Sequence, residues 1–294
     1  MKITKEQAIF NIISYLLIIL ICVFCIFPLI LIVSASFTDN TALTRAGYHL
    51  IPAKYSLAAY KTIFEYPQKL IMAYANTILV TVIGTLFGVL CVTMTSYVLM
   101  RKDFLYRNRV SFLIYFTTIF GGGMVPWYIL LSNYLHLSNT YAARIFPSLM
   151  SPFLIILMRT FMQSSVPDEI IESVKVDGAG DFKIYTRIIL PIITPAIATV
   201  ALFLAVGFWN EWYLTSLFIS KKEMYSLQYF LYDVLNSINF AKEMASVTGQ
   251  IPLDLPTETV KMAMVVIVIG PIIFLYPFVQ KYFISGITVG AVKG

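Results

Sequence analysis

Long apolar runs separated by shorter polar intervals dominate the chain. An α-helix needs ~20 residues to cross ~30 Å of hydrocarbon, and six runs come near or exceed that length. They cover residues 10–33, 71–100, 110–131, 141–161, 192–219 and 262–279. Because 59% of the 294 residues are hydrophobic and only 12% are charged, the composition is that of a membrane protein. We therefore predict an all-α integral membrane protein in which residues 1–294 form one transmembrane domain.

The basic residues indicate how these spans are oriented. The N-terminus, the 101–109 loop, the 159–191 stretch and the C-terminal end carry more than half of the 21 Lys and Arg residues. Basic residues next to spans mark the cytoplasmic side, so both termini are expected on the cytoplasmic side of the membrane. The net charge of +6 does not indicate nucleic-acid binding, because the basic residues lie beside spans rather than in a stripe with interleaved aromatics.

A charged interval at about 164–191 separates the fourth and fifth apolar runs. Asp168 and Glu169 suit the first turn of a short helix, where negative charge is favoured. Ile171 and Val174 fall on one face of that helix, and Gly178 interrupts it before a second helix leads to a Leu-Pro step. The pattern predicts a helix-turn-helix elbow whose apolar ridge, including Ile171 and Val174, is available to a partner.

The elbow resembles a known cytoplasmic loop. Glu172, Gly178 and the Ile188-x-Leu190-Pro191 ending have the spacing of the EAA loop of bacterial ABC-importer permeases, although Ser173 and Val174 stand where that family has two alanines. The resemblance implies a coupling helix that enters a groove of a cytoplasmic ATPase. The residues it implies in coupling are Glu169, Ile171, Glu172, Ser173, Val174, Asp177, Gly178, Ala179, Leu190 and Pro191. The alternative is an ordinary interhelical loop.

Two further segments resemble the carbohydrate branch of the same family. Trp209-Asn210-Glu211 is similar to a segment of that branch, and the C-terminal tail is similar to that of the second permease of maltose-type transporters. In that type the tail reaches the ATPase, which would assign contacts to Ser285, Gly286, Gly290, Ala291 and Lys293. Residues 121–127 look like those of Gram-positive oligosaccharide permeases, so an oligosaccharide is the expected solute.

The resemblance also implies a set of partners. They are a second permease that completes a heterodimer, a cytoplasmic ATPase dimer that binds ATP and Mg²⁺, an extracytoplasmic solute-binding lipoprotein and membrane lipid. The segments at about 35–70 and 220–259 read as extracytoplasmic loops. They either meet the binding protein or only link spans.

Two places are candidates for the translocation path. Gly121, Gly122 and Gly123 interrupt the third span just before Trp127, and non-helical backbone at membrane depth persists only beside protein or a water-filled cavity. A bent helix packed on its neighbours is the alternative. Asn210 and Glu211 are expected near the outer end of the fifth span, where an acidic residue is a functional candidate.

One small-residue pattern predicts close helix packing. Gly84 and Gly88 in the second span form a Gly-x-x-x-Gly pattern, which lets two helices approach closely in lipid. We expect this face to contact another helix, with a helix of the same chain as the simplest partner.

The sequence offers little catalytic chemistry. It contains no G-x-x-x-x-G-K-[ST] phosphate loop, so ATP hydrolysis is expected on a partner, and no cofactor of its own is expected. Cys22, Cys25 and Cys91 lie in predicted spans and do not form a metal-binding set. The alternatives that remain are an ABC permease for a solute other than sugar and, as a different class, a membrane-embedded enzyme.

Overall fold

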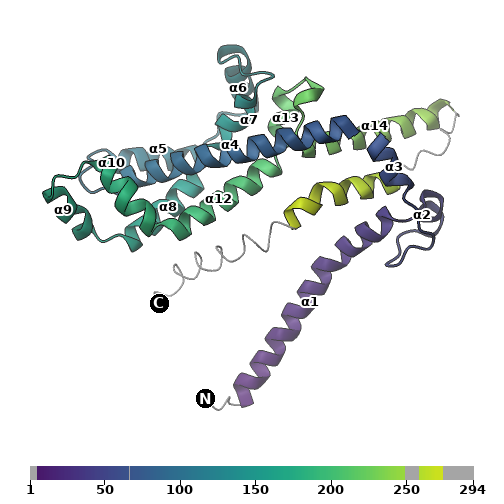
Figure 1. Cartoon of the computed structure of the whole chain (residues 1–294), viewed down its shortest axis with the longest axis horizontal. Coiled ribbons are helices and arrows are strands. Elements are labelled where there is room, and N and C mark those ends of the chain that lie inside the picture. The colour runs from purple at the N-terminus through teal and green to yellow at the C-terminus, as the bar shows by residue number, and fades with distance from the viewer. Residues whose placement is uncertain (1–4, 66, 249–257, 274–294) are drawn as a thin grey trace. The chain divides into compact units, whose positions relative to one another are not determined.

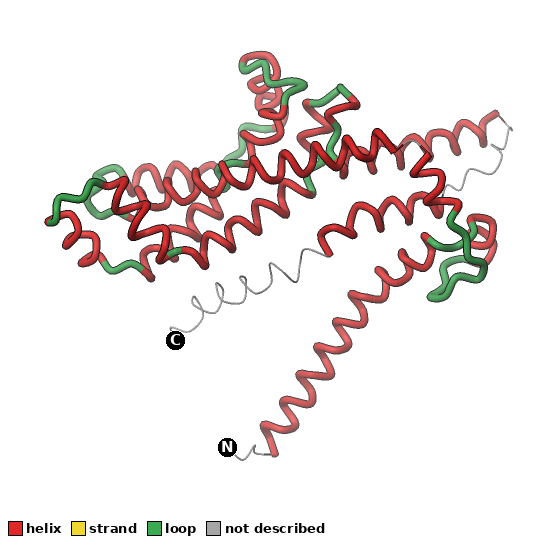
Figure 2. Tube along the Cα trace, in the orientation of Figure 1, coloured by secondary structure: helices red, strands yellow, loops and turns green. Residues whose placement is uncertain are grey.

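The computed structural model describes residues 5–65, 67–248 and 258–273. Within these ranges the chain is built of helices (Figure 2), and an isolated antiparallel bridge joins Thr38 to Tyr55. The all-α prediction is therefore confirmed for the described residues. The chain divides into two compact units, of which unit 1 contains residues 1–67 and 231–271 and unit 2 contains residues 68–230 and 272–294.

Unit 1 begins with a long apolar helix. The helices of its first part are α1 (Lys5–Ser36), α2 (Asn40–Ala46) and α3 (Ala58–Glu65). Side chains of α1 such as Phe10 and Phe24 are more than two-thirds exposed, as expected for a helix that lies in lipid. The end of α1 is held by Ser36, whose Oγ lies 2.9 Å from the hydroxyl oxygen of Tyr60 on α3. The later part of unit 1 contributes most of α14 (Leu227–Thr248) and the helix 258–273.

The predicted spans differ in how continuous they are. The helices α1 and α4 (Pro67–Met100) are each long and apolar enough to cross a membrane alone. Three further candidate spans are bent pairs of helical segments, namely Arg107–Ile119 with Met124–Tyr134 at 113°, Tyr141–Ser148 with Pro152–Ser165 at 47°, and Asp181–Ile192 with Thr194–Trp209 at 84°. The sixth predicted span, 262–279, extends beyond the described helix, which reaches residue 273.

Unit 2 contains the remaining named helices. They are α5 (Arg107–Ile119), α6 (Met124–Ile129), α7 (Tyr141–Ile145), α8 (Pro152–Ser165), α9 (Asp168–Val176), α10 (Asp181–Ile184), α11 (Leu190–Ile192), α12 (Thr194–Trp209) and α13 (Tyr213–Phe218). A π-helical turn at Tyr185–Ile189 joins α10 to α11. Within this unit, Figure 1 shows α9 and α10 at one end and α6 and α13 nearer the other.

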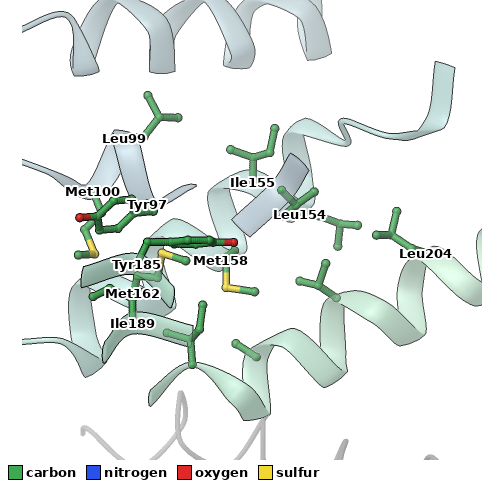
Figure 3. Close-up of a cluster of buried hydrophobic side chains, with 14 of the residues drawn as sticks. Tyr97, Leu99, Met100, Leu154, Ile155, Met158, Met162, Tyr185, Ile189 and Leu204 are labelled. Atoms are coloured by element: carbon green, nitrogen blue, oxygen red, sulfur yellow. The ribbon is translucent and has the colours of Figure 1, made fainter. Parts of the chain in front are cut away.

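The core of unit 2 lies where α4, α8 and α12 meet. Its buried side chains include Tyr97 of α4, Met158 and Met162 of α8, and Leu204 of α12 (Figure 3). Ser96 Oγ also donates a hydrogen bond of 2.9 Å to the carbonyl of Ile155 on α8. These contacts pack α4, α8 and α12 together, and the elbow connects α8 to α12.

The Gly-x-x-x-Gly face of α4 packs against α12. A Cβ atom placed on Gly84 would lie 2.6 Å from the ring of Phe208, and one on Gly88 would lie 2.9 Å from Cδ1 of Leu204. Both distances are shorter than a van der Waals contact, so only glycine permits this approach. The prediction that this face contacts another helix is confirmed, and the partner belongs to the same chain.

One boundary predicted from the sequence is wrong. The fifth apolar run does not continue as one helix to 219, because α12 ends at Trp209 and the Asn210 side chain donates a 3.0 Å hydrogen bond to the carbonyl of Val206. The 220–259 stretch, expected as an extracytoplasmic loop, contains the 22-residue helix α14. Ser226 begins that helix, since its Oγ accepts a hydrogen bond of 3.1 Å from the amide of Tyr229.

Candidate functional site

The elbow between α8 and α12 begins with α9. Its first turn holds Asp168 and Glu169, where the positive end of the helix dipole stabilises carboxylates. Pro167 precedes the helix at φ −61° and ψ 140°, an extended conformation that separates α9 from α8. The short helix predicted here is therefore confirmed.

A Schellman motif ends α9. The amide of Gly178 donates to the carbonyl of Lys175 at 2.9 Å, and the amide of Ala179 donates to the carbonyl of Val174 at 3.2 Å. Gly178 adopts φ +79°, a left-handed conformation that favours glycine. These two bonds satisfy carbonyl groups at the helix end and direct the chain toward α10.

The face of α9 that the sequence assigned to a partner is directed inward instead. Ile171 is 5% exposed, and Val174 and Ala179 pack against the same cluster of buried residues. The prediction that Ile171 and Val174 form an open ridge is therefore wrong. An amphipathic helix buries its apolar face against the core of its own domain. The apolar face of α9 covers the core of unit 2 in this way.

The opposite face of α9 is open and mostly acidic. Val176 is 88% exposed and is the most exposed apolar side chain of the helix. The exposed coupling candidates around it are Glu169, Glu172, Ser173, Asp177 and Gly178. The outward surface therefore combines carboxylates with one apolar side chain.

The remaining coupling candidates lie where the elbow returns to the bundle. Leu190 is partly buried and packs against the core, whereas Pro191 is exposed. Pro191 does not end the helical segment, which runs to Ile192 before the 84° bend into α12. A proline within the first turn of α11 needs no amide hydrogen bond, so the segment accommodates it.

Charged side chains tie the elbow to the loop that follows α4. Three ion pairs join the two segments: Lys102 with Asp168, Lys175 with Asp103, and Arg101 with Asp181. Arg101 also forms a two-point contact with Asp103, in which Nε donates to Oδ1 at 2.9 Å and Nη2 approaches Oδ2. We call this set of six residues the charged clamp.

The charges of the clamp stabilise one another. Hydrogen bonds from Arg101 and then from Lys175 hold the pKa of Asp103 well below its usual range. A carboxyl group whose pKa is lowered by folding stabilises the folded state above its ordinary pKa of about 3.9. That contribution is lost only as the pH falls through the lowered value. The Asp103 side of the clamp is thus fully charged near neutral pH.

The other candidate residues lie toward the α6 and α13 end of unit 2. Glu211 is not within a helical span but in the turn between α12 and α13, where it is 9% exposed. Its Oε2 accepts from Arg144 Nε at 3.0 Å and from Thr215 Oγ1 at 2.8 Å, and its Oε1 accepts from the Thr215 amide at 2.9 Å. Asn210 is exposed, and its Oδ1 accepts a hydrogen bond of 3.1 Å from Gln228.

The predicted break at the three glycines is present. Gly121, Gly122 and Gly123 separate α5 from α6, and the two segments are bent by 113°. All three are exposed, and a Cβ on Gly121 or Gly122 would have no neighbour within 4 Å. The bend itself agrees with either interpretation from the sequence, a lining of the path or a bent helix packed on its neighbours. Trp127 instead packs edge-on against Phe218 of α13, with ring centroids 5.3 Å apart.

Known proteins match the chain along nearly its whole length. Residues 4–289 match the family described as binding-protein-dependent transport system inner membrane component. The chain belongs to this family. The polygalacturonan/rhamnogalacturonan transport system permease YtcP of Bacillus subtilis is 33% identical to this permease over 98% of the chain and 100% of the relative. The trehalose/maltose transport system permease MalG of Thermococcus litoralis is 28% identical over 99% of each chain.

A solved structure agrees with these relatives. A chain in the crystal structure of a bacterial ABC transporter that imports the acidic polysaccharide alginate matches this permease with a TM-score of 0.81 and 29% identity. The match covers 95% of the permease and 98% of that chain. The protein is thus an ABC-importer permease subunit of the cell membrane rather than an enzyme, and a separate subunit hydrolyses ATP. The membrane-embedded enzyme considered from the sequence is excluded.

Sequence reasoning missed the charged clamp and the partner of Glu211. Arg101, Lys102 and Lys175 of the permease were counted as orientation signals, and nothing in their spacing indicates which carboxylates they meet. Arg144, the partner of Glu211, is fully buried. Its position inside the apolar 141–161 run was the available signal, because a cation at such a place needs a buried partner. The C-terminal candidates Ser285, Gly286, Gly290, Ala291 and Lys293 lie outside the described residues.

Proposed function

We propose that this permease passes an oligosaccharide across the membrane and that α9 is the surface on which the cytoplasmic ATPase acts. The observation that carries the proposal is the two-sided character of α9. Ile171 anchors its inner side in the core, while Glu172 and Val176 are exposed on its outer side. A helix whose inner side is packed in the core and whose outer side is exposed can transmit a movement of the ATPase to the permease.

The outward face indicates the chemistry of the groove that receives it. Glu169, Glu172 and Asp177 are exposed carboxylates, so a complementary groove presents basic or amide groups. The exposed side chain of Val176 fits an apolar depression between them. We therefore propose that the coupling contact is made by Glu169, Glu172, Ser173, Val176 and Asp177. Ile171, Val174, Ala179 and Leu190 support that contact from behind.

We further propose a topology of six spans with both termini in the cytoplasm. The interval between the fourth and fifth spans then faces the cytoplasm, where the ATPase is. Two of the predicted spans, 10–33 and 71–100, lie in continuous helices. Three others, 110–131, 141–161 and most of 192–219, lie in bent pairs of helices. We assign these five regions to five of the spans. The helix 258–273 contains the described part of the sixth proposed span, 262–279.

The translocation path passes the α5–α6 break. The exposed backbone at Gly121, Gly122 and Gly123 offers carbonyl and amide groups to a polar solute. Asn210 offers a side-chain amide. Glu211, by contrast, is already bonded to Arg144 and Thr215, so we assign it to holding the 210–212 turn in place rather than to touching the solute.

The relatives support a solute class and a set of partners. The names of the similar permeases refer to polygalacturonan, rhamnogalacturonan, trehalose and maltose, which are all carbohydrates. We therefore place this chain in a heterodimer with a second permease, above an ATPase dimer that binds ATP and Mg²⁺. An extracytoplasmic solute-binding lipoprotein delivers the sugar, and the C-terminal tail provides a further ATPase contact.

Co-purification of the ATPase through a tag on this permease tests the docking of α9. Glu172→Lys and Val176→Asp should each reduce the amount of ATPase retained and reduce sugar uptake by proteoliposomes, while the permease pair remains assembled. Leu105→Asp is the matched control, since Leu105 is also 88% exposed but lies on the loop after α4. Wild-type retention in both α9 variants, or an equal loss in the control, would contradict the proposal.

A further inference from the structure

We propose that Arg101 and Asp103 are positioning residues that make the elbow and α4 move as one body. The inference rests on the proposed docking of α9, because it describes where a displacement of α9 goes next. A displacement of the elbow can reach the bundle through the covalent connection of α11 and α12. The charged clamp provides a second connection, to α4.

The contacts of α4 with the elbow form a continuous row. Thr93 and Tyr185 share a hydrogen bond of 2.8 Å between their hydroxyl groups, and the rings of Tyr97 and Tyr185 have centroids 5.5 Å apart. Arg101 Nη1 then donates to Asp181 Oδ1 at 2.8 Å. Residues 93, 97 and 101 are spaced by four, so they present one side of α4 and its continuation to the helices that follow α9.

The clamp holds α9 at both ends. Lys102 contacts Asp168 in the first turn, and Lys175 Nζ lies 2.5 Å from Asp103 Oδ2 in the last turn. Near the first turn, a cavity of about 470 Å³ lies between the elbow and the loop. Its lining includes Lys102, Arg159, Asp168 and Glu169. The ion pair of Lys102 with Asp168 therefore lies at this cavity and joins the first turn of α9 to the loop.

Arg101 is the residue on which the clamp depends most. An exposed ion pair contributes little to stability, and the Lys102 and Asp168 side chains are 73% and 42% exposed. The Arg101 side chain is 9% exposed and reaches Asp103, Asp181 and the Tyr97 hydroxyl at once. A lysine cannot make that set of contacts, because it lacks the planar fork of a guanidinium.

Close packing carries the motion onward from α4. The absence of side chains at Gly84 and Gly88 brings the backbone of α4 close to Phe208 and Leu204 of α12, and close-packed interiors transmit displacement from one element to the next. A shift of the elbow that pulls on residues 101–103 is therefore expected to move α4 and the α12 surface beside it. Breaking the clamp should leave the ATPase bound to α9 but disconnect its closure from the spans.

The test uses the whole importer in proteoliposomes and compares Arg101→Gln with Arg109→Gln. Arg109 is an exposed arginine beside the same loop that stacks over Tyr106 rather than joining the clamp. Arg101→Gln should retain the ATPase and its basal hydrolysis. The stimulation of hydrolysis by sugar-loaded binding protein should fall about tenfold, the scale expected from losing a hydrogen bond to a charged group. Arg109→Gln should behave as wild type.

A second variant and a cross-linking rescue distinguish loss of the clamp from misfolding of the permease. Asp103→Asn removes a charge from a side chain that is 54% exposed, so the fold is preserved while stimulation falls. In an Arg101→Gln background without native cysteines, a bifunctional thiol reagent that links Lys102→Cys to Asp168→Cys should restore stimulation.

Three results would overturn the clamp: wild-type stimulation in both Arg101→Gln and Asp103→Asn, loss of the ATPase itself from Arg101→Gln, or a cross-link without effect. Failure of the docking proposal looks different, because Glu172→Lys would then keep the ATPase bound.

Discussion

The guanidinium of Arg144 and the carboxylate of Glu211 meet inside unit 2, with Nε and Oε2 3.0 Å apart and the arginine fully buried. This pair joins α7 to the turn between α12 and α13. Arg144 Nη1 also donates to the carbonyl of Met224 at 3.3 Å, so the pair organises three segments of this end of the unit.

Removing one partner should therefore destabilise the permease. Glu211→Leu leaves Arg144 buried without its carboxylate, a change that typically costs about 3–5 kcal/mol. Thermal unfolding of the purified permease pair, followed by intrinsic fluorescence, should show a lowered Tm. The double variant Arg144→Met with Glu211→Leu should recover most of the loss, because apolar residues replace a buried pair at little cost.

The same double variant separates a positioning role from a solute contact. If Glu211 only holds the turn, the stable double variant should transport sugar. A double variant with wild-type Tm and no uptake would instead place Glu211 among the residues that touch the solute.

The packing of α4 on α12 can be tested with alanine. Gly84→Ala places a methyl group 2.6 Å from the Phe208 ring, so the helices must separate and Tm should fall. Gly207→Ala on α12 is the matched control, because its Cβ would have no neighbour within 4 Å. It should be neutral or stabilise the helix by up to ~1 kcal/mol. Equal Tm values for both variants would contradict the packing account.

The left-handed residue that ends α9 gives a test of the elbow. Gly178→Ala forces a side chain into φ +79°, at a cost of about 1–2 kcal/mol, so the elbow should loosen and coupled ATP hydrolysis should fall. Gly178→Asn should be tolerated better, because asparagine enters this conformation more readily. Gly180→Ala, at φ −71°, should retain coupling. Coupling that survives in Gly178→Ala and Gly178→Leu alike would show that the turn is not required.

The break between α5 and α6 is the test of the translocation path. Gly122→Leu adds a side chain where a Cβ has no neighbour within 4 Å, so folding and assembly with the ATPase should be unchanged. If the break lines the path, the added bulk should slow sugar uptake. Unchanged uptake would assign the break to bending of the span alone.

Much of the helical pattern could be predicted because apolar runs and chain-breaking residues act locally. The glycine break at 121–123, the short helix α9 and the Gly84 contact all follow from side-chain size, capping and backbone freedom. The position of α14 could not be predicted from composition, because its Tyr- and Asn-rich sequence resembles a loop until Ser226 is seen to cap it.

The site was less predictable because it depends on which segments meet. An amphipathic α9 could be recognised, but its apolar side suits either a partner or the chain's own core, and only the fold places Ile171 inside. The same holds for Arg101, whose carboxylate partners are two and 80 residues away in the sequence. Long-range pairing of charges leaves no periodic signal.

Cysteine cross-linking from α9 tests the central claim that this elbow meets the ATPase. In a permease without Cys22, Cys25 and Cys91, Val176→Cys places a thiol on the open face and Ile171→Cys places one in the core. With a short bifunctional reagent added to the assembled importer, the account predicts that Val176→Cys links to the ATPase subunit and that Ile171→Cys does not. An importer that hydrolyses ATP normally but forms no link from position 176, or links equally from both positions, would contradict it.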